Sequence, residues 1–146
     1  MLKTIIAAMA LSLALAAQGW AAGSSSSSVK RTSTYDTAVK AVDAGQYRTA
    51  IPLLKKVVAK NPKHYDALNY LGFSHRQLGD YDTAFAYYKK VLTAQPRHRG
   101  ANEYLGELYL KLGKPELAKQ RLAVLRKACK LGCEEYDDLK AAIEAF

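Results

Sequence analysis

A 34-residue period runs through most of this 146-residue chain and limits what it can fold into. The period is carried by glycine, alanine and proline at these positions: Gly45, Gly79 and Gly113; Ala50, Ala84 and Ala118; Gly72 and Gly106; Pro62 and Pro96. Chance agreement would rarely extend past one or two positions. The spacing therefore predicts repeated supersecondary units that stack on one another and bury a shared core.

The period divides the chain into segments 31–64, 65–98 and 99–132, and each reads as two amphipathic helices. In the second segment, apolar residues spaced three and four apart predict a helix over 65–78. A turn at Gly79 and a second helix over 81–94 follow, and Pro96 ends that helix because proline cannot continue a helix interior. Each segment is thus expected to be a helix-turn-helix unit.

The second segment reads Leu68-x-x-Leu71-Gly72-x-x-His75, Gly79-x-Tyr81-x-x-Ala84-x-x-x-Tyr88 and Pro96. This pattern resembles the tetratricopeptide repeat, which has small residues at its eighth and twentieth positions so that two helices can approach. The third segment matches it through Leu105, Gly106, Tyr109 and Ala118, while the first departs at Thr34, Thr37 and Ala38. The resemblance implies an all-α solenoid of three units, with a degraded first repeat at a solvent-facing end.

A further helix is predicted after the last repeat, over 134–145. Tyr136, Leu139, Ile143 and Phe146 recur at helical spacing, and two glutamates favour its N-terminus. Gly132 is expected to end the helix before it. We interpret the 134–145 helix as a cap on the exposed face of the third repeat, which gives a folded domain over 33–146.

The N-terminus has the three parts of a secretory signal peptide: Lys3, an apolar run of about 13 residues and small residues around Trp20. The run is short for a membrane span, which needs about 20 residues. We predict cleavage after Ala21, with an uncleaved anchor as the alternative. Residues 22–32, which include five consecutive serines, are expected to form a flexible leader. The alanine-rich apolar run favours a bacterial periplasm, and secretion is the alternative.

The two cysteines, Cys129 and Cys133, are expected to form a disulfide. Oxidising compartments favour such bonds. Structural zinc usually takes four ligands, and the spacing fits neither a CxxCH haem motif nor a redox CxxC. The disulfide would lock the junction between the last repeat and the capping helix.

The net charge of +9 is unevenly distributed: +5, +1 and +5 over the three repeats and −4 from Cys133 onward. Many of the basic residues lie in the second helices: Lys55, Lys56, Lys89, Lys90, Lys119 and Arg121. In the family that the chain resembles, second helices form the convex face. We therefore expect a solvated outer face, with an anionic envelope component as an alternative partner. Nucleic acid is not expected for an exported chain.

No motif supports catalysis, cofactor binding or a metal site. The sequence has no GxSxG, Walker or HExxH pattern. His75 stands at a core aromatic position of the repeat and is expected to be packed, while His64 and His98 lie in inter-repeat turns. Glu103 and Glu107, one helical turn apart, are expected to line a groove rather than to act as an acid pair. We predict a binding module rather than an enzyme.

The resemblance implies that the first helices line a concave groove. Its variable positions map onto Tyr35, Val39, Val42, Asn69, Phe73, Arg76, Glu103, Glu107 and Leu110. Such a groove suits an extended segment or a helix with apolar anchors and some positive charge. Phe73, Tyr35 and Arg76 are the first candidate anchors, since aromatic and arginine residues dominate interfaces. The alternatives are that some of these residues only pack internally, and that the repeats self-associate.

Overall fold

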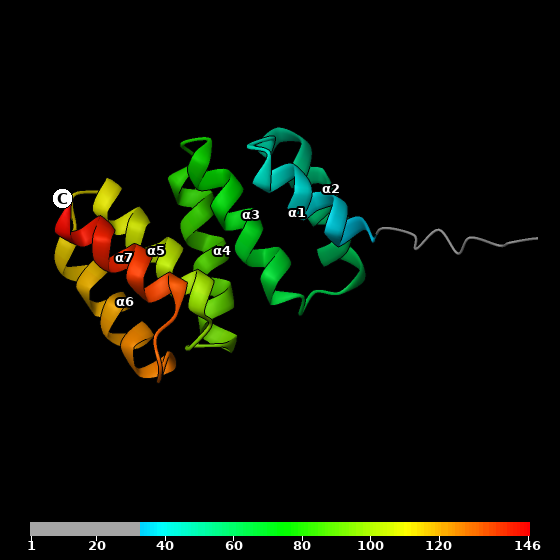
Figure 1. Ribbon diagram of the computed structural model, residues 1–146. Helices are drawn as coiled ribbons and strands as arrows, with labels where there is room; N and C mark the ends of the chain where they lie inside the picture. Colours follow the sequence, from blue (N-terminus) through cyan, green and yellow to red (C-terminus); the bar gives the residue numbers. More distant parts are fainter. Residues whose placement is uncertain (1–32) are drawn as a thin grey trace, which may run out of the picture. The chain divides into compact units, whose positions relative to one another are not determined.

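The structure, a computed structural model, describes residues 33–146. The described chain forms seven helices: α1 (Thr34–Asp43), α2 (Tyr47–Lys60), α3 (Tyr65–Gln77), α4 (Tyr81–Ala94), α5 (Arg99–Lys111), α6 (Pro115–Ala128) and α7 (Glu134–Glu144) (Figure 1). The expected signal peptide over 1–21 and leader over 22–32 lie outside the described residues. No helix in residues 33–146 is both long and apolar enough to cross a membrane.

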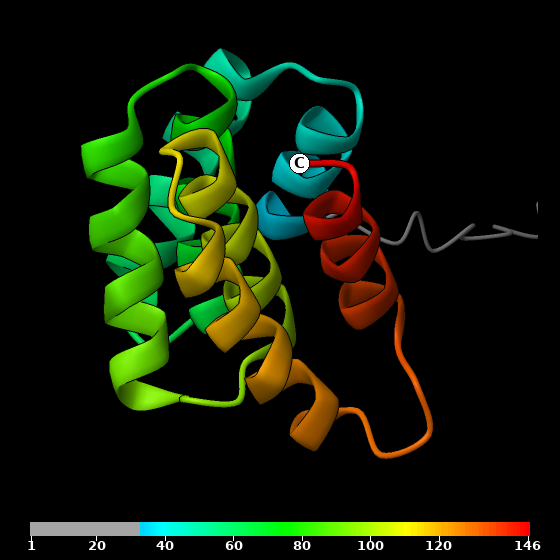
Figure 2. The same cartoon turned by 90° about the vertical axis from the view of Figure 1, so that its left-hand side faces the viewer.

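The helices form three antiparallel pairs, α1/α2, α3/α4 and α5/α6, and each pair packs against the next. Helix α7 then packs against both α5 and α6, on the opposite side of α6 from α4 (Figure 2). The predicted all-α repeat solenoid is thus confirmed. The predicted boundaries are close, since α4 begins and ends as expected and α3 and α7 each end one residue early.

The turn inside each pair depends on a glycine with a left-handed backbone. Gly45, Gly79 and Gly113 have φ of +70°, +83° and +68°. In the second pair, the Gly79 N–H donates to the carbonyl of Arg76 and the Asp80 N–H to that of His75, at 3.0 and 2.9 Å. Residues with a Cβ rarely adopt this conformation. The glycine period in the sequence therefore reflects the backbone geometry of three equivalent turns.

The expectation that Gly132 ends the last repeat helix is wrong. Helix α6 ends four residues earlier, at Ala128, while Gly132 has φ of +92° in the link to α7 and donates to the carbonyl of Cys129 at 3.2 Å. Helices α2, α4 and α6 end at Lys60, Ala94 and Ala128, which are 34 residues apart. The repeat register, rather than a local glycine, sets where the helix stops.

The space beside the small residue at the eighth repeat position is occupied by different side chains in the second and third units. A Cβ on Gly72 would lie 2.5 Å from the ring of Tyr88, which is fully buried. A Cβ on Gly106 would lie 2.5 Å from Leu139 of α7, also fully buried. In the third unit, therefore, the side chain that packs against the eighth position comes from α7 rather than from the second helix of the same pair.

The first repeat folds like the others despite its weaker sequence match. Ala38, at its eighth position, is fully buried. Ser33 caps α1, accepting from the N–H of Asp36 while the Asp36 carboxylate accepts from the N–H of Ser33. This capping box satisfies backbone donors that would otherwise lack partners at the start of the helix.

Candidate functional site

A hollow of about 560 Å³ lies where the N-terminal halves of α1, α3, α5 and α7 meet. It is lined by Tyr35, Asp66, Asn69, Tyr70, Arg97, His98, Arg99, Gly100, Glu103, Tyr104, Glu134, Glu135 and Asp138. A second hollow, of about 350 Å³, is lined by Arg76, Gln77, Glu107, Leu110, Lys111 and Ala142 from the C-terminal halves of α3, α5 and α7. We call these the open end and the closed end of the concave face.

Six of the nine predicted groove residues line these two hollows. Tyr35, Asn69 and Glu103, which are spaced 34 residues apart, line the open end. Arg76, Glu107 and Leu110 line the closed end. Val39, Val42 and Phe73 line neither; Val42 is a buried core residue, and Phe73 packs against the core.

The closed end is occupied by its own side chains. Arg76 is only 4% exposed and forms an ion pair with Glu107. Its guanidinium carbon lies 5.2 Å from the ring centroid of Phe73 and 5.6 Å from that of Tyr104, and these two rings are 4.7 Å apart. Two of the three candidate anchors, Phe73 and Arg76, are therefore engaged with each other and with α5.

The open end contains buried polar groups that lack internal partners. Asn69 is 5% exposed, and no described residue forms a hydrogen bond with its Oδ1. A Cβ on Gly100 would lie 2.8 Å from Asn69 Nδ2, so the first turn of α5 closely approaches this amide. Glu103 is 7% exposed and forms no ion pair with any described residue.

The electrostatic potential at the open end is negative. Burial first, and then the carboxylates of Glu107, Asp138 and Glu135, raise the pKa of Glu103 to about 8, against the opposing effect of Arg76. The pKa values of Tyr35, Tyr70 and Tyr104 are also raised, first by burial and then by nearby carboxylates. Burial and like charges both disfavour ionisation of an acid. With a pKa of about 8, Glu103 is mostly protonated at neutral pH, and the negative charge at this end comes from Asp66, Glu134, Glu135 and Asp138, which outnumber Arg97 and Arg99.

Two histidines cap the first helices α3 and α5, a role that the sequence analysis missed, and one of them, His98, lines the open end. The Nδ1 atoms of His64 and His98 accept from the N–H groups of Ala67 and Ala101, at 3.3 and 3.2 Å. Nε2 of His98 also lies 3.1 Å from Asp66 Oδ1 and so links the start of α5 to the start of α3. The available signal in the sequence was that both histidines, 34 residues apart, come just before a predicted first helix.

His75 is mostly buried, as expected. It lies 2.9 Å from Asp80 and its ring centroid is 5.7 Å from that of Tyr87.

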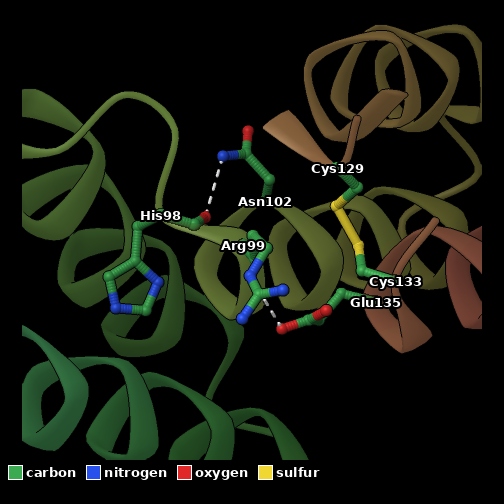
Figure 3. Close-up of a disulfide and its surroundings, with 6 residues drawn as sticks. All are labelled: His98, Arg99, Asn102, Cys129, Cys133 and Glu135. Atoms are coloured by element: carbon green, nitrogen blue, oxygen red, sulfur yellow. Dashed lines mark hydrogen bonds and ion pairs between the residues drawn. A yellow bond between two sulfur atoms is a disulfide. The ribbon is translucent and has the colours of Figure 1, made fainter. Parts of the chain in front are cut away.

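The predicted disulfide joins the last repeat to α7. Cys129 follows the end of α6 and Cys133 precedes the start of α7, with Cα atoms 5.6 Å apart (Figure 3). Close to this bond, Arg99 Nε lies 3.4 Å from Glu135 Oε1. The disulfide and the ion pair together fix the first turn of α7 beside α5, where α7 forms one wall of the open end.

Solved structures with this fold are similar to the chain over most of its length. The type III secretion translocator chaperone SycD of Yersinia enterocolitica, in an alternative dimer, has a TM-score of 0.66 at 17% identity, over 77% of this chain and 84% of that one. PcrH in complex with the chaperone binding region of PopB has a TM-score of 0.64 at 18% identity, over 77% and 90%. No curated protein matches the sequence.

Two family models, both described as tetratricopeptide repeat, match residues 35–98 and 75–143. Together they extend over all three helix pairs and nearly all of α7. The match agrees with the glycine turns and with the small residues at the eighth and twentieth positions. The chain therefore belongs to the tetratricopeptide-repeat family.

Proposed function

We propose that this protein is an interaction module that binds an extended segment of a partner protein along its concave face. The observation that carries the proposal is the open end, where Tyr35, Asn69 and Glu103 of three successive repeats line one hollow with α7. The buried Asn69 Oδ1 has no hydrogen-bond partner in the described residues, and such a group is costly to bury. A bound segment would supply the missing contacts.

The solved structures support this proposal by analogy. The structure of PcrH, which has the same fold, holds the chaperone binding region of PopB. At 18% identity the likeness extends to the fold only, so the partner of this chain remains to be identified by experiment.

Site-directed photo-crosslinking in cells tests the proposal. A photoreactive phenylalanine analogue replaces Tyr35 on the concave face or, as a control, Tyr87. Both tyrosines are half-buried, and Tyr87 lies on α4 in a separate hollow with Asp82 and Lys90. We expect one partner to be captured from position 35 and not from position 87. Equal capture from both positions, or capture only of a second copy of the chain, would refute binding by the concave face.

We further propose that the chain is exported to the periplasm after cleavage behind Ala21. The signal-like N-terminus and the Cys129–Cys133 bond support this location, because stable disulfides are typical of oxidising compartments. Mass spectrometry of the protein from a periplasmic extract should find Ala22 as the first residue and no alkylatable thiol. An intact N-terminus in the membrane fraction would favour the uncleaved anchor.

A further inference from the structure

We propose that the open end of the concave face is a subsite for one basic side chain, arginine or lysine, of the bound segment. This inference rests on the proposed function and specifies what the partner must present there. It is carried by the charges at the open end, by one row of acceptors across three helices and by the surrounding tyrosine rings.

Carboxylates outnumber cations at the open end. The hollow is lined by Asp66, Glu103, Glu134, Glu135 and Asp138, against Arg97, Arg99 and His98. Two of these carboxylates have partners, since Asp66 lies 3.1 Å from His98 and Glu135 lies 3.4 Å from Arg99. Glu103, Glu134 and Asp138 form no ion pair within residues 33–146. Arg97 is exposed, as are Asp66, Glu134 and Asp138, so Glu103 is the one buried acid of the five.

Stabilisation of helix N-termini explains three of these five carboxylates but not the other two. Asp66, Glu134 and Glu135 stand in the first turns of α3 and α7, where negative charge stabilises a helix. Glu103 and Asp138 lie one turn further in, where the effect of the helix dipole has declined. Their presence beside one hollow is therefore not a consequence of helix capping.

Asn69, Glu103 and Asp138 form one row across the concave face. Each is the fifth residue of its helix, in α3, α5 and α7 respectively, and all three line the hollow. Helix α7 thus continues the register of the repeats, although it lies outside the 34-residue pattern. An amide and two carboxylates offer several acceptor oxygens to a ligand that can donate several hydrogen bonds.

Asn69 provides a second, independent observation at the same hollow. Asn69 is only 5% exposed, and its Oδ1 has no hydrogen-bond partner in the described part of the chain. An acceptor buried without a partner costs about 1–3 kcal/mol. A guanidinium or ammonium group would donate to it.

Three tyrosines complete the surroundings of the row. Tyr35, Tyr70 and Tyr104 line the same hollow, and the centroids of Tyr35 and Tyr70 are 6.3 Å apart. Aromatic faces attract cations, and the attraction grows as the cation leaves water. A basic side chain would be held by carboxylates at its charged end and by rings along its stem. A bound cation would favour the ionised form of Glu103, whose pKa is about 8 in the free chain, whereas an acidic or purely apolar side chain would not.

Nuclear magnetic resonance titration of the full chain tests the subsite without knowledge of the partner. The probe is Nα-acetyl-arginine methylamide, and the uncharged isostere Nα-acetyl-citrulline methylamide is the matched control. We expect the arginine probe to shift the resonances of Asn69, Glu103 and Asp138 in a saturable manner. The citrulline probe should bind at least about tenfold more weakly, which corresponds to about 1.4 kcal/mol.

Two double variants sharpen the test. Glu103→Gln with Asp138→Asn should weaken the arginine probe about tenfold or more. Glu116→Gln with Glu144→Gln removes two exposed carboxylates outside the hollow and should leave binding unchanged. Circular dichroism checks that each variant is folded, and the comparison of arginine with citrulline on the unmodified chain holds even if one is not.

Equal binding of arginine and citrulline, or shifts confined to other surfaces, would overturn the subsite. The two proposals can fail separately. Partner capture from position 35 with no probe binding would reject only the basic subsite. Probe binding without any captured partner would support the subsite and reject the wider groove.

Discussion

The two ends of the concave face are built from the same helices, α3, α5 and α7, and yet differ in what they leave free. At the closed end, Arg76 is paired with Glu107 and stacked near Phe73. At the open end, Asn69 and Glu103 are equally buried but have neither a hydrogen-bond partner for Oδ1 nor an ion pair within the described residues. At the closed end the charge of Arg76 is compensated by an ion pair, although its Nε has no hydrogen-bond partner in residues 33–146, whereas at the open end Glu103 has no such ion pair.

This difference shows that the position of a residue in the repeat does not by itself determine its role. A first-helix side chain can face the groove and still be used for packing between repeats when a complementary group stands one repeat away. Arg76 and Glu107 are 31 residues apart and meet because neighbouring repeats stack. A binding role is best assigned where such complementarity is missing.

The largest predicted effect removes the wall that both ends share. Leu139→Ala should destabilise the protein by about 3–5 kcal/mol, because Leu139 is fully buried against Gly106 and holds α7 in place. Chemical denaturation measures the change. Leu112→Ala, at a residue that is 41% exposed, is the control and should cost much less. Similar losses for both variants would mean that α7 contributes little.

The uncompensated carboxylate at the open end should make stability depend on pH. The pKa of Glu103 is about 8 in the fold, above its ordinary value, so the folded state holds a proton that the unfolded state has released. Stability should therefore fall by a few kcal/mol between about pH 4.5 and 8 and change little above that, at about 1.4 kcal/mol for each pH unit.

Thermal unfolding across this range checks the prediction. Glu103→Gln should flatten the profile and raise the melting temperature at pH 8. Glu116→Gln, at an exposed side chain, should leave the profile as it is. A profile that rises between pH 5 and 8 and is unaffected by Glu103→Gln would contradict a negative open end.

Substitution of Arg76 at the closed end and of Asn69 at the open end compares how much each buried polar residue contributes to stability. Arg76→Ala should cost about 2 kcal/mol, since it removes a charged hydrogen bond and leaves Glu107 without its partner. Asn69→Ala should cost less than about 1 kcal/mol, because Oδ1 gives up no hydrogen bond. Urea denaturation of the two variants gives the comparison, and the opposite order would show that the open end is the satisfied one.

Loss of the disulfide should have a small effect on stability and a selective effect on the open end. Changing Cys129 and Cys133 to serine opens a loop of only five residues, worth at most about 2 kcal/mol of chain entropy. Amide resonances of Glu134, Glu135 and Asp138 should shift, while those around Arg76 should not. Equal shifts at both ends would indicate that α7 moves as a rigid whole.

Much of the fold was predictable from the sequence because the repeat fixes both turn geometry and helix length. The 34-residue glycine spacing located three turns, and Pro96 bounded α4 correctly. The end of α6 was misplaced because a local glycine signal was preferred to the repeat register. Helix α7 was predicted as a helix, but Asp138 could not be placed in the groove, since α7 has no counterpart in the period.

The candidate site was predicted less completely, for a physical reason. Repeat positions specify which way a Cα–Cβ bond points, but long side chains such as Arg76 can still turn toward an internal partner. The pairing of Arg76 with Glu107, and that of His98 at the start of α5 with Asp66 on α3, depends on how α5 packs beside α3. Such contacts require the stacking geometry, which a single sequence does not provide.

The neighbour-to-neighbour packing of the helices gives unfolding a direction. Within the described chain, α1 packs mainly against α2, whereas α7 is held by α5, by α6 and by the disulfide. We expect a linear array of this kind to unfold locally first at α1, the end that no disulfide holds. Fraying of α1 would carry Tyr35 away from the hollow while Glu103 and Asp138 stay in place. The open end, the proposed binding surface, would then lose one of its sides before the other repeats unfold.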